Sequence, residues 1–136
     1  MSLFSSPTFL RNVLLADAAS CVGCGALQVA FTGAVSPMLG LGTSLLTGTG
    51  LFLLVYAGVV GFVATRKPIA RPLVWLLIFG NLGWAVLCVG LLFSGTVQPT
   101  ALGTGYVVAQ AVTVTLLAEL QWFALRRGAG GSLSAA

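Results

Sequence analysis

The sequence predicts an all-α membrane protein, a bundle of four transmembrane helices with both termini on the cytoplasmic side. Two observations predict this class. Of the 136 residues, 58% are hydrophobic and only 6% are charged, whereas soluble domains usually carry about 25% charged residues. The apolar residues also gather into four long stretches. Such a composition leaves no hydrophilic exterior, which excludes a soluble enzyme, a disordered chain and a nucleic-acid binder despite the net charge of +4.

The four expected spans follow one another with short connections and form a single domain over residues 1–127. Each span has about 22 residues, which gives roughly 33 Å of helix and matches one bilayer. The spans are expected at residues 12–34, 44–65, 73–94 and 103–125. The five prolines fall in the tails, in the loops or at a helix start, so the spans should be straight. The small and polar residues 128–136 predict a disordered tail.

All six basic residues flank the spans on one side of the predicted bundle. They precede the first span, fill the loop between the second and third, and follow the fourth: Arg11, Arg66, Lys67, Arg71, Arg126 and Arg127. The other two loops, near residues 35–43 and 95–102, carry no charge. Because positively charged loops stay in the cytoplasm, both termini and the middle loop are expected there.

The two acidic residues, Asp17 and Glu119, lie inside predicted spans. Counted from the nearest flanking arginine, both lie roughly 9–11 Å inside the cytoplasmic boundary at helical rise. Asn81 and Tyr56 lie about 15 Å inside by the same count. Each span therefore contributes one member to a polar layer on the cytoplasmic side. We expect Asp17, Glu119, Asn81 and Tyr56 to form an ion-binding or proton-binding site.

Two interpretations of this layer remain open. A charged carboxylate inside a span costs on the order of 2.5–3.5 kcal/mol, so it must be protonated, hydrogen-bonded or hydrated. If the bundle brings the two acids together, they should share a proton and titrate as a coupled pair, while Asn81 and Tyr56 donate to the ionised form. Alternatively, the acids are a static clamp between helices, hydrogen-bonded to Asn81, Ser20 or Gln121.

The fourth span has polar residues on two sides. Glu119 shares its side with Thr115, whereas Gln110 lies half a turn away and shares its side with Gln121. One side is expected to face the bundle and the other a further helix or subunit. Gln28 and Gln110 both lie about 25 Å from the cytoplasmic charges, so they could pair near the outer surface.

Small residues at four-residue spacing predict where the helices approach one another closely. Such rows occur on the first, second and fourth spans: Ala26, Ala30 and Ala34; Ala57 and Gly61; Gly105, Ala109 and Thr113. The same faces could serve a compact bundle or a homodimer.

Cys21, Cys24 and Cys88 all lie inside spans, which excludes a disulfide framework of the secreted type. Cys21 and Cys24 are three residues apart on one helix and could bind a soft metal ion, with Cys88 as a further candidate ligand. The run Ser20-Cys21-Val22-Gly23-Cys24 resembles the cysteine pair in the first span of bacterial four-helix mercury-uptake proteins. That resemblance implies soft-metal uptake. The alternative is that the cysteines only pack helix interfaces.

Four further runs are spread over most of the chain. They are Leu14-Leu15-Ala16-Asp17-Ala18, Gly80-Asn81-Leu82-Gly83-Trp84, Pro99-Thr100-Ala101-Leu102-Gly103 and Ala118-Glu119-Leu120-Gln121. Together they resemble a set of small bacterial four-span integral membrane proteins of uncharacterised function. The resemblance implies four spans and a location in the bacterial inner (plasma) membrane. It implies no activity, substrate or cofactor.

The sequence thus favours a proton- or cation-linked transporter or channel. It should be a homo-oligomer, because four helices enclose little room for a solute. The alternative is a structural or accessory subunit of a larger membrane complex, and soft-metal uptake is a minor third hypothesis. An enzyme is not expected, because the chain has no histidine and no nucleophile beside a base. The expected partners are the lipid bilayer and membrane subunits, with no nucleic acid; the cofactor is unknown.

Overall fold

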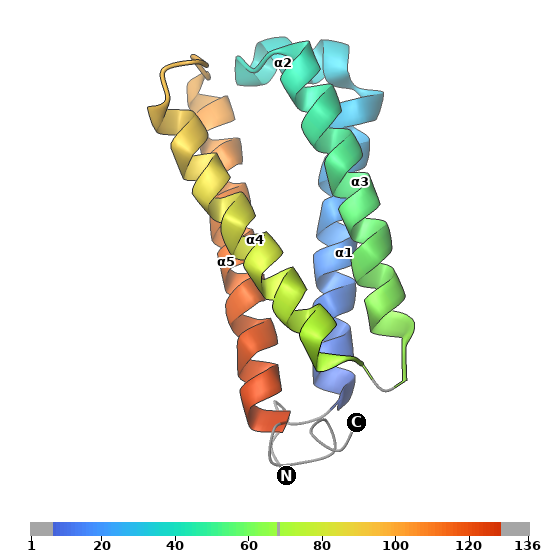
Figure 1. Cartoon of the computed structure of the whole chain (residues 1–136). Coiled ribbons are helices and arrows are strands. Elements are labelled where there is room, and N and C mark those ends of the chain that lie inside the picture. Colours follow the sequence, from blue (N-terminus) through green and yellow to red (C-terminus); the bar gives the residue numbers. More distant parts are fainter. Residues whose placement is uncertain (1–6, 68, 129–136) are drawn as a thin grey trace.

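The computed structural model describes residues 7–67 and 69–128 (Figure 1). These residues form α-helices and connecting loops without a β-strand. The helices are α1 (Pro7–Ala30), α2 (Thr32–Leu39), α3 (Thr43–Thr65), α4 (Arg71–Phe93) and α5 (Ala101–Gly128). Except for α2, each is long and apolar enough to cross a membrane. The predicted all-α class and the four apolar spans are therefore confirmed. Of the predicted tail, Gly128 is the last residue of α5 and residues 129–136 lie outside the described part of the chain.

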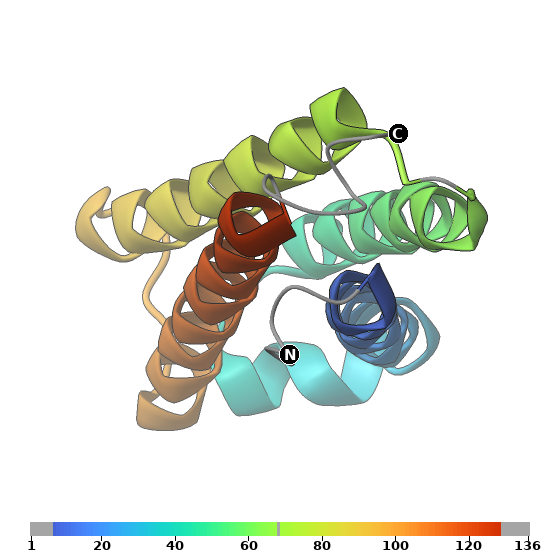
Figure 2. The ribbon, with the colours of Figure 1, turned by 90° about the horizontal axis from the view of Figure 1, so that it is seen from below.

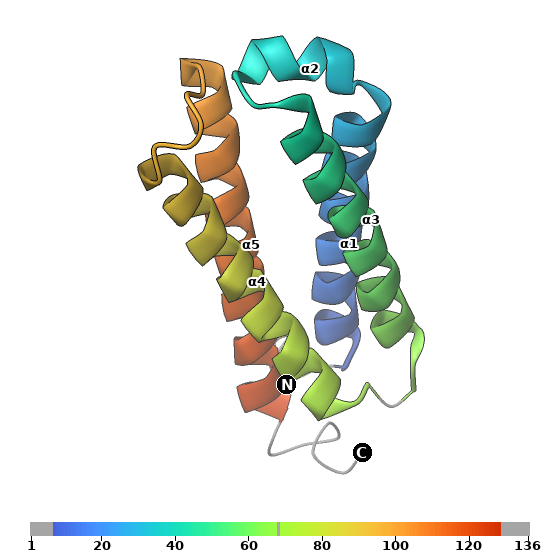
Figure 3. The same cartoon turned by 45° about the horizontal axis from the view of Figure 1, so that its top comes forward.

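The short helix α2 occupies most of the segment where the sequence predicted a loop. α1 ends at Ala30, and α2 begins two residues later and ends at Leu39. The left-handed conformation of Gly40, with φ of 68°, stops the helix, and its amide donates to the Ser36 carbonyl at 2.9 Å. Figures 1 and 3 show α2 lying across the end of the bundle, where it contacts α1, α3 and α5.

The four long helices are arranged as two pairs. α1 packs mainly along α3, and α4 packs mainly along α5. The pairs meet chiefly through α1 and α5, whereas α3 and α4 have little contact. Figures 1 and 3 show that α3 and α4 are connected at one end of the bundle and diverge toward α2. We call these ends the basic end, which carries the arginines that flank the long helices, and the α2 end. Figure 2 views the bundle from the basic end.

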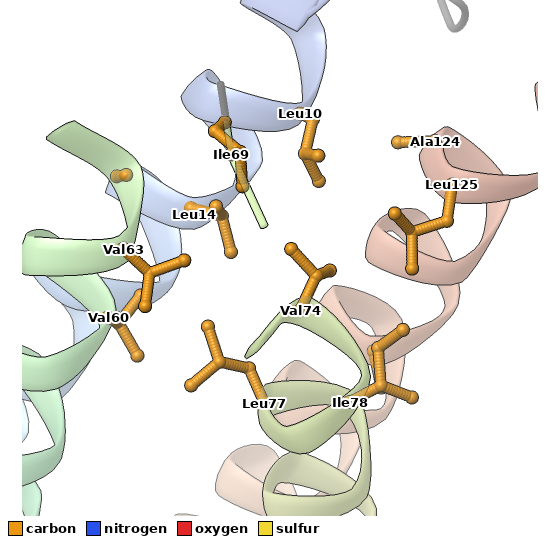
Figure 4. Packing of buried hydrophobic residues seen from close by; sticks show 12 residues of the cluster. Leu10, Leu14, Val60, Val63, Ile69, Val74, Leu77, Ile78, Ala124 and Leu125 are labelled. Atoms are coloured by element: carbon orange, nitrogen blue, oxygen red, sulfur yellow. The ribbon is translucent and has the colours of Figure 1, made fainter. Parts of the chain in front are cut away.

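The largest buried apolar cluster closes the basic end, and its side chains point toward one another from all four long helices (Figure 4). Its members are Leu10, Leu14, Val60, Val63, Ala64, Ile69, Val74, Leu77, Ile78, Ala118, Ala124 and Leu125. Ile69 belongs to the loop between α3 and α4 and is buried with the others. This region is densely packed, which supplies the van der Waals attraction that holds helices together where lipid offers no hydrophobic driving force.

Two arginines tie helix ends together at the basic end. Arg11 on α1 donates from Nε to the Ala64 carbonyl at 2.7 Å and from Nη2 to the Arg66 carbonyl at 3.1 Å. Arg71 on α4 donates to the Leu125 carbonyl of α5 at 3.2 Å. The last carbonyls of a helix have no partner within the helix, so these contacts satisfy the ends of α3 and α5.

α1 and α3 approach each other closely at Gly25 and Gly50. A Cβ atom on Gly25 would lie 2.8 Å from the Gly50 carbonyl oxygen, and a Cβ atom on Gly50 would lie 2.8 Å from Val29 Cγ2. In contrast, Ala26 and Ala30 are exposed, as is Ala34 in α2. The predicted row of small residues on the first span therefore does not pack inside the bundle, and its use in a homodimer stays a prediction. The contact between α1 and α3 lies on a neighbouring side of the helix.

Replacing Gly50 by leucine should separate α1 from α3 and lower the free energy of unfolding by about 1–3 kcal/mol, because the added side chain has no space. The measurement is unfolding in detergent micelles by titration with sodium dodecyl sulfate. Gly58→Leu is the matched control, because it lies on the same helix with open space around it and gains the same helix propensity. Equal stability of the two variants would contradict the close contact at Gly50.

Candidate functional site

Asp17 on α1 lies at the centre of a polar cluster where the four long helices meet. Its side chain is fully buried, with 0% of its surface exposed. Asp17 Oδ2 accepts hydrogen bonds from Asn81 Nδ2 of α4 and from Gln121 Nε2 of α5, both at 2.8 Å. The Cys21 thiol, one helical turn away, lies 3.7 Å from Oδ1 as a weak donor. We call Asp17, Cys21, Tyr56, Asn81 and Gln121 the buried polar cluster.

Tyr56 brings α3 into this cluster and orients Asn81. Its hydroxyl lies 3.0 Å from the Leu77 carbonyl and 3.3 Å from Asn81 Oδ1, and it donates to these acceptors. The Asn81 amide thus presents its oxygen to Tyr56 and its NH₂ group to Asp17. Gly80 gives the tyrosine room, because a Cβ atom there would lie only 3.2 Å from the Tyr56 hydroxyl oxygen.

The Asp17 carboxylate receives hydrogen bonds from neutral groups only: two amides and a thiol. An ionised carboxylate can accept about four hydrogen bonds, and one of these three is weak. Beside it, the buried Gln121 Oε1 has no hydrogen-bond partner among the described residues. The cluster therefore contains a carboxylate and an unpaired amide oxygen. None of the three hydrogen-bond donors to the Asp17 carboxylate carries a positive charge. Such an arrangement favours the uptake of a proton or a small cation.

Glu119 does not join Asp17, which corrects the expectation that the two acids meet. Its side chain is exposed on the outer side of α5, whereas Asp17 is completely buried. The residue of α5 that reaches Asp17 is Gln121, two positions further along, which is about 200° around the helix. Sequence analysis placed Gln121 on the same side of the span as Gln110, and this is the side that faces the bundle.

A second polar group lies nearer the α2 end. The buried Gln28 donates from Nε2 to the Tyr106 hydroxyl at 2.6 Å and accepts from the Thr49 hydroxyl at 2.7 Å. Gln110 Oε1 accepts from Trp84 Nε1 at 3.0 Å. The expected pairing of Gln28 with Gln110 is therefore wrong, because each residue has other partners. These bonds link α1 to α3 and α5, and α4 to α5.

Cavities lie on both sides of Trp84, between the helix pairs. One of about 330 Å³ is bordered by α1 and α5 and reaches Cys21, whose thiol contacts Asp17. The other, of about 530 Å³, lies beside Thr49 and Ser94. Trp84 itself stacks on Phe52 with ring centroids 5.5 Å apart. The bundle is thus hollowed toward the α2 end and densely packed at the basic end.

The cysteines do not form the three-ligand metal site that the sequence suggested. Cys21 is buried with Leu53 and Ala57 of α3, and the half-buried Cys24 packs against them. Cys88 instead packs against Leu46 and Val107 in the apolar cluster at the α2 end. Within the described part of the chain, no group of three or more His, Cys, Asp or Glu side chains could hold a metal ion.

Comparison with known proteins finds no matching family model, no matching curated protein and no matching solved structure. The two resemblances drawn from short runs of sequence therefore stay predictions.

Removing the amide of Asn81 should destabilise the bundle through Asp17. Asn81→Leu leaves the buried carboxylate with one strong donor, and we expect a loss of about 1–3 kcal/mol in the free energy of unfolding. Combining it with Asp17→Leu removes both partners, so the double variant should lose less than the sum of the single losses. The measurement is unfolding by sodium dodecyl sulfate in micelles. Glu119→Leu, which changes an exposed acid, is the control; additive losses at Asp17 and Asn81 would contradict the bond.

Proposed function

We propose that this chain is a small proton- or cation-linked transporter or channel in which Asp17 binds the proton or cation. The observation that carries the proposal is the fully buried Asp17 carboxylate, which only neutral donors contact, beside the unpaired oxygen of Gln121. An unbalanced charge inside a membrane span is costly and is usually functional. A proton on Asp17, or a monovalent cation held by these oxygens, would supply the balancing charge.

The distribution of packing along the bundle supports this proposal. The cavities beside Trp84 lie on the α2 side of the buried polar cluster, and the large apolar cluster lies on its other side. A transport site needs access from one side at a time. In this conformation the ion site has hollow space toward the α2 end and a closed barrier at the basic end. Transport would require the barrier to open.

The charge pattern supports an orientation for this site. All six basic residues lie at or beyond the basic end of the described helices, and positive loops favour the cytoplasm. We therefore place both termini in the cytoplasm and the α2 end outside, in the inner membrane of a bacterium. The buried polar cluster then lies on the cytoplasmic side of the bilayer centre, with the cavities beside Trp84 on its outer side.

A structural or accessory role in a larger membrane complex is the second candidate, and Glu119 favours it. This carboxylate is exposed on α5 at spanning depth, beside the exposed side chains of Leu116 and Leu120. A second copy or another subunit that covers this face would shield Glu119 from lipid. On that account, Asp17 serves only to clamp the helices. Soft-metal uptake through Cys21 and Cys24 has less support, because Cys21 is buried and its thiol contacts Asp17.

Asp17→Asn should abolish ion flux if Asp17 carries the transported charge. The protein is reconstituted into vesicles that contain a pH-sensitive dye, and flux is followed after a proton, sodium or potassium gradient is imposed. Glu119→Gln is the matched control, because it neutralises the other intramembrane acid and lies outside the buried polar cluster, so its flux should remain. Equal flux from the wild type and both variants would defeat the proposal. Absence of flux together with a stoichiometric copurifying subunit would favour the accessory role.

The proposed orientation can be tested by labelling single cysteines in whole cells. In a chain whose native cysteines are replaced by alanine, Thr96→Cys should react with a membrane-impermeant maleimide on intact cells. Lys67→Cys should react only after the cells are permeabilised. Both positions are exposed in loops. The reverse pattern would place the basic end outside and contradict the orientation.

A further inference from the structure

The cavity between α1 and α5 is open on the side of the bundle rather than enclosed within it. Among the residues that line it, Gly23, Leu27, Ala109 and Thr113 are exposed. Counted from Arg11 at helical rise, the α1 side of the cavity lies roughly 14–24 Å above the basic end, and counted from Arg126 the α5 side lies roughly 18–30 Å above it. The cavity therefore begins near the centre of a hydrocarbon layer about 30 Å thick and extends toward its outer boundary. A molecule that enters from the bilayer would thus reach this cavity without passing through water.

The walls of the cavity are mainly apolar, and no charged side chain lines them. Four polar side chains interrupt the apolar surface, namely Ser20, Cys24, Gln110 and Thr113. Trp84 holds the Gln110 amide by donating to its oxygen at 3.0 Å. Sites for small molecules commonly combine an apolar lining with a few polar groups that orient the ligand, in volumes of about 300–1,000 Å³. The volume of about 330 Å³ falls within that range.

A second hollow of about 650 Å³ extends the cavity toward the α2 end. The two share Leu27 and Tyr106 in their linings. The other residues around the second hollow are apolar and include Phe31, Met38 and Leu102. An elongated molecule could place one polar group beside Gln110 and Thr113 and extend an apolar tail past the exposed Leu27 into the bilayer.

We infer that this cavity binds a neutral lipophilic molecule from the bilayer that carries a hydroxyl or carbonyl group on a long apolar tail. The uncharged lining excludes a ligand with a buried ionised group, because nothing there would balance its charge. The same lining holds no charged side chain that could pair with the phosphate of a phospholipid headgroup. This inference stands apart from ion transport, since it depends on the lining of the cavity and does not require Asp17 to change its charge.

The test uses a long-chain fatty alcohol that carries a photoreactive diazirine, added to the purified protein in lipid nanodiscs. After illumination, mass spectrometry locates the labelled peptides. Labelling should concentrate on residues 20–27 of α1 and 106–114 of α5. An excess of unlabelled fatty alcohol should suppress it, whereas the same excess of phosphatidylcholine should not. Even labelling of all exposed helix faces, or suppression by phosphatidylcholine, would overturn the inference.

Gly23→Leu provides a variant that should block the cavity without disturbing the fold. A Cβ atom at Gly23 meets nothing within 4 Å, so the leucine side chain can extend into the open space. Gly83→Leu on α4 is the matched control, because that glycine is equally exposed with open space around it. We expect Gly23→Leu to lower labelling at least fivefold and Gly83→Leu to leave it unchanged, with both variants as stable as the wild type. Equal labelling of the two variants would overturn the inference.

Discussion

The hydrogen bonds to Asp17 join the two helix pairs from which the bundle is built. The α1–α3 pair supplies the carboxylate, and the α4–α5 pair supplies the amides of Asn81 and Gln121. Tyr56 adds a bond from α3 to Asn81. Because lipid tails are as apolar as the helix surfaces, polar bonds and close packing must provide much of the attraction between the pairs. The dense core at the basic end and the hollow space toward α2 lie on opposite sides of this junction.

This junction gives the proposed ion binding a direct structural consequence. Ionised Asp17 accepts from two amides through one oxygen. A proton on Oδ1 would leave Oδ2 as a carbonyl oxygen that still accepts from both amides, but both bonds between the pairs would weaken because the negative charge is lost. A cation bound at the same oxygens would compete with the amide NH₂ groups. Binding of a proton or cation at Asp17 would therefore weaken the hydrogen bonds between the two helix pairs. The apolar cluster that closes the basic end packs between the same two pairs, so it would be affected as well.

Hydropathy and charge were sufficient to predict the four spans, because apolar length and the positions of arginines are properties of the sequence alone. Counting residues also placed Asp17, Asn81 and Tyr56 at depths that allow them to meet. The count failed for Glu119, because depth along a helix says nothing about rotation around it, and the cluster member proved to be Gln121. The partner of a polar face depends on how whole helices pack, which no short run of residues determines.

The two intramembrane acids therefore have different chemistry although they differ little in depth. Glu119 and Gln121 are about 3 Å apart along α5 but point about 200° apart, so one residue meets the exterior of the bundle and the other meets Asp17. Asp17 has hydrogen-bond donors within the chain, but none of these donors carries a balancing charge. Glu119 is exposed beside the apolar Leu116 and Leu120, so inside a bilayer it needs a proton or a partner from another molecule. A role in transport depends on Asp17, and a role in assembly depends on Glu119.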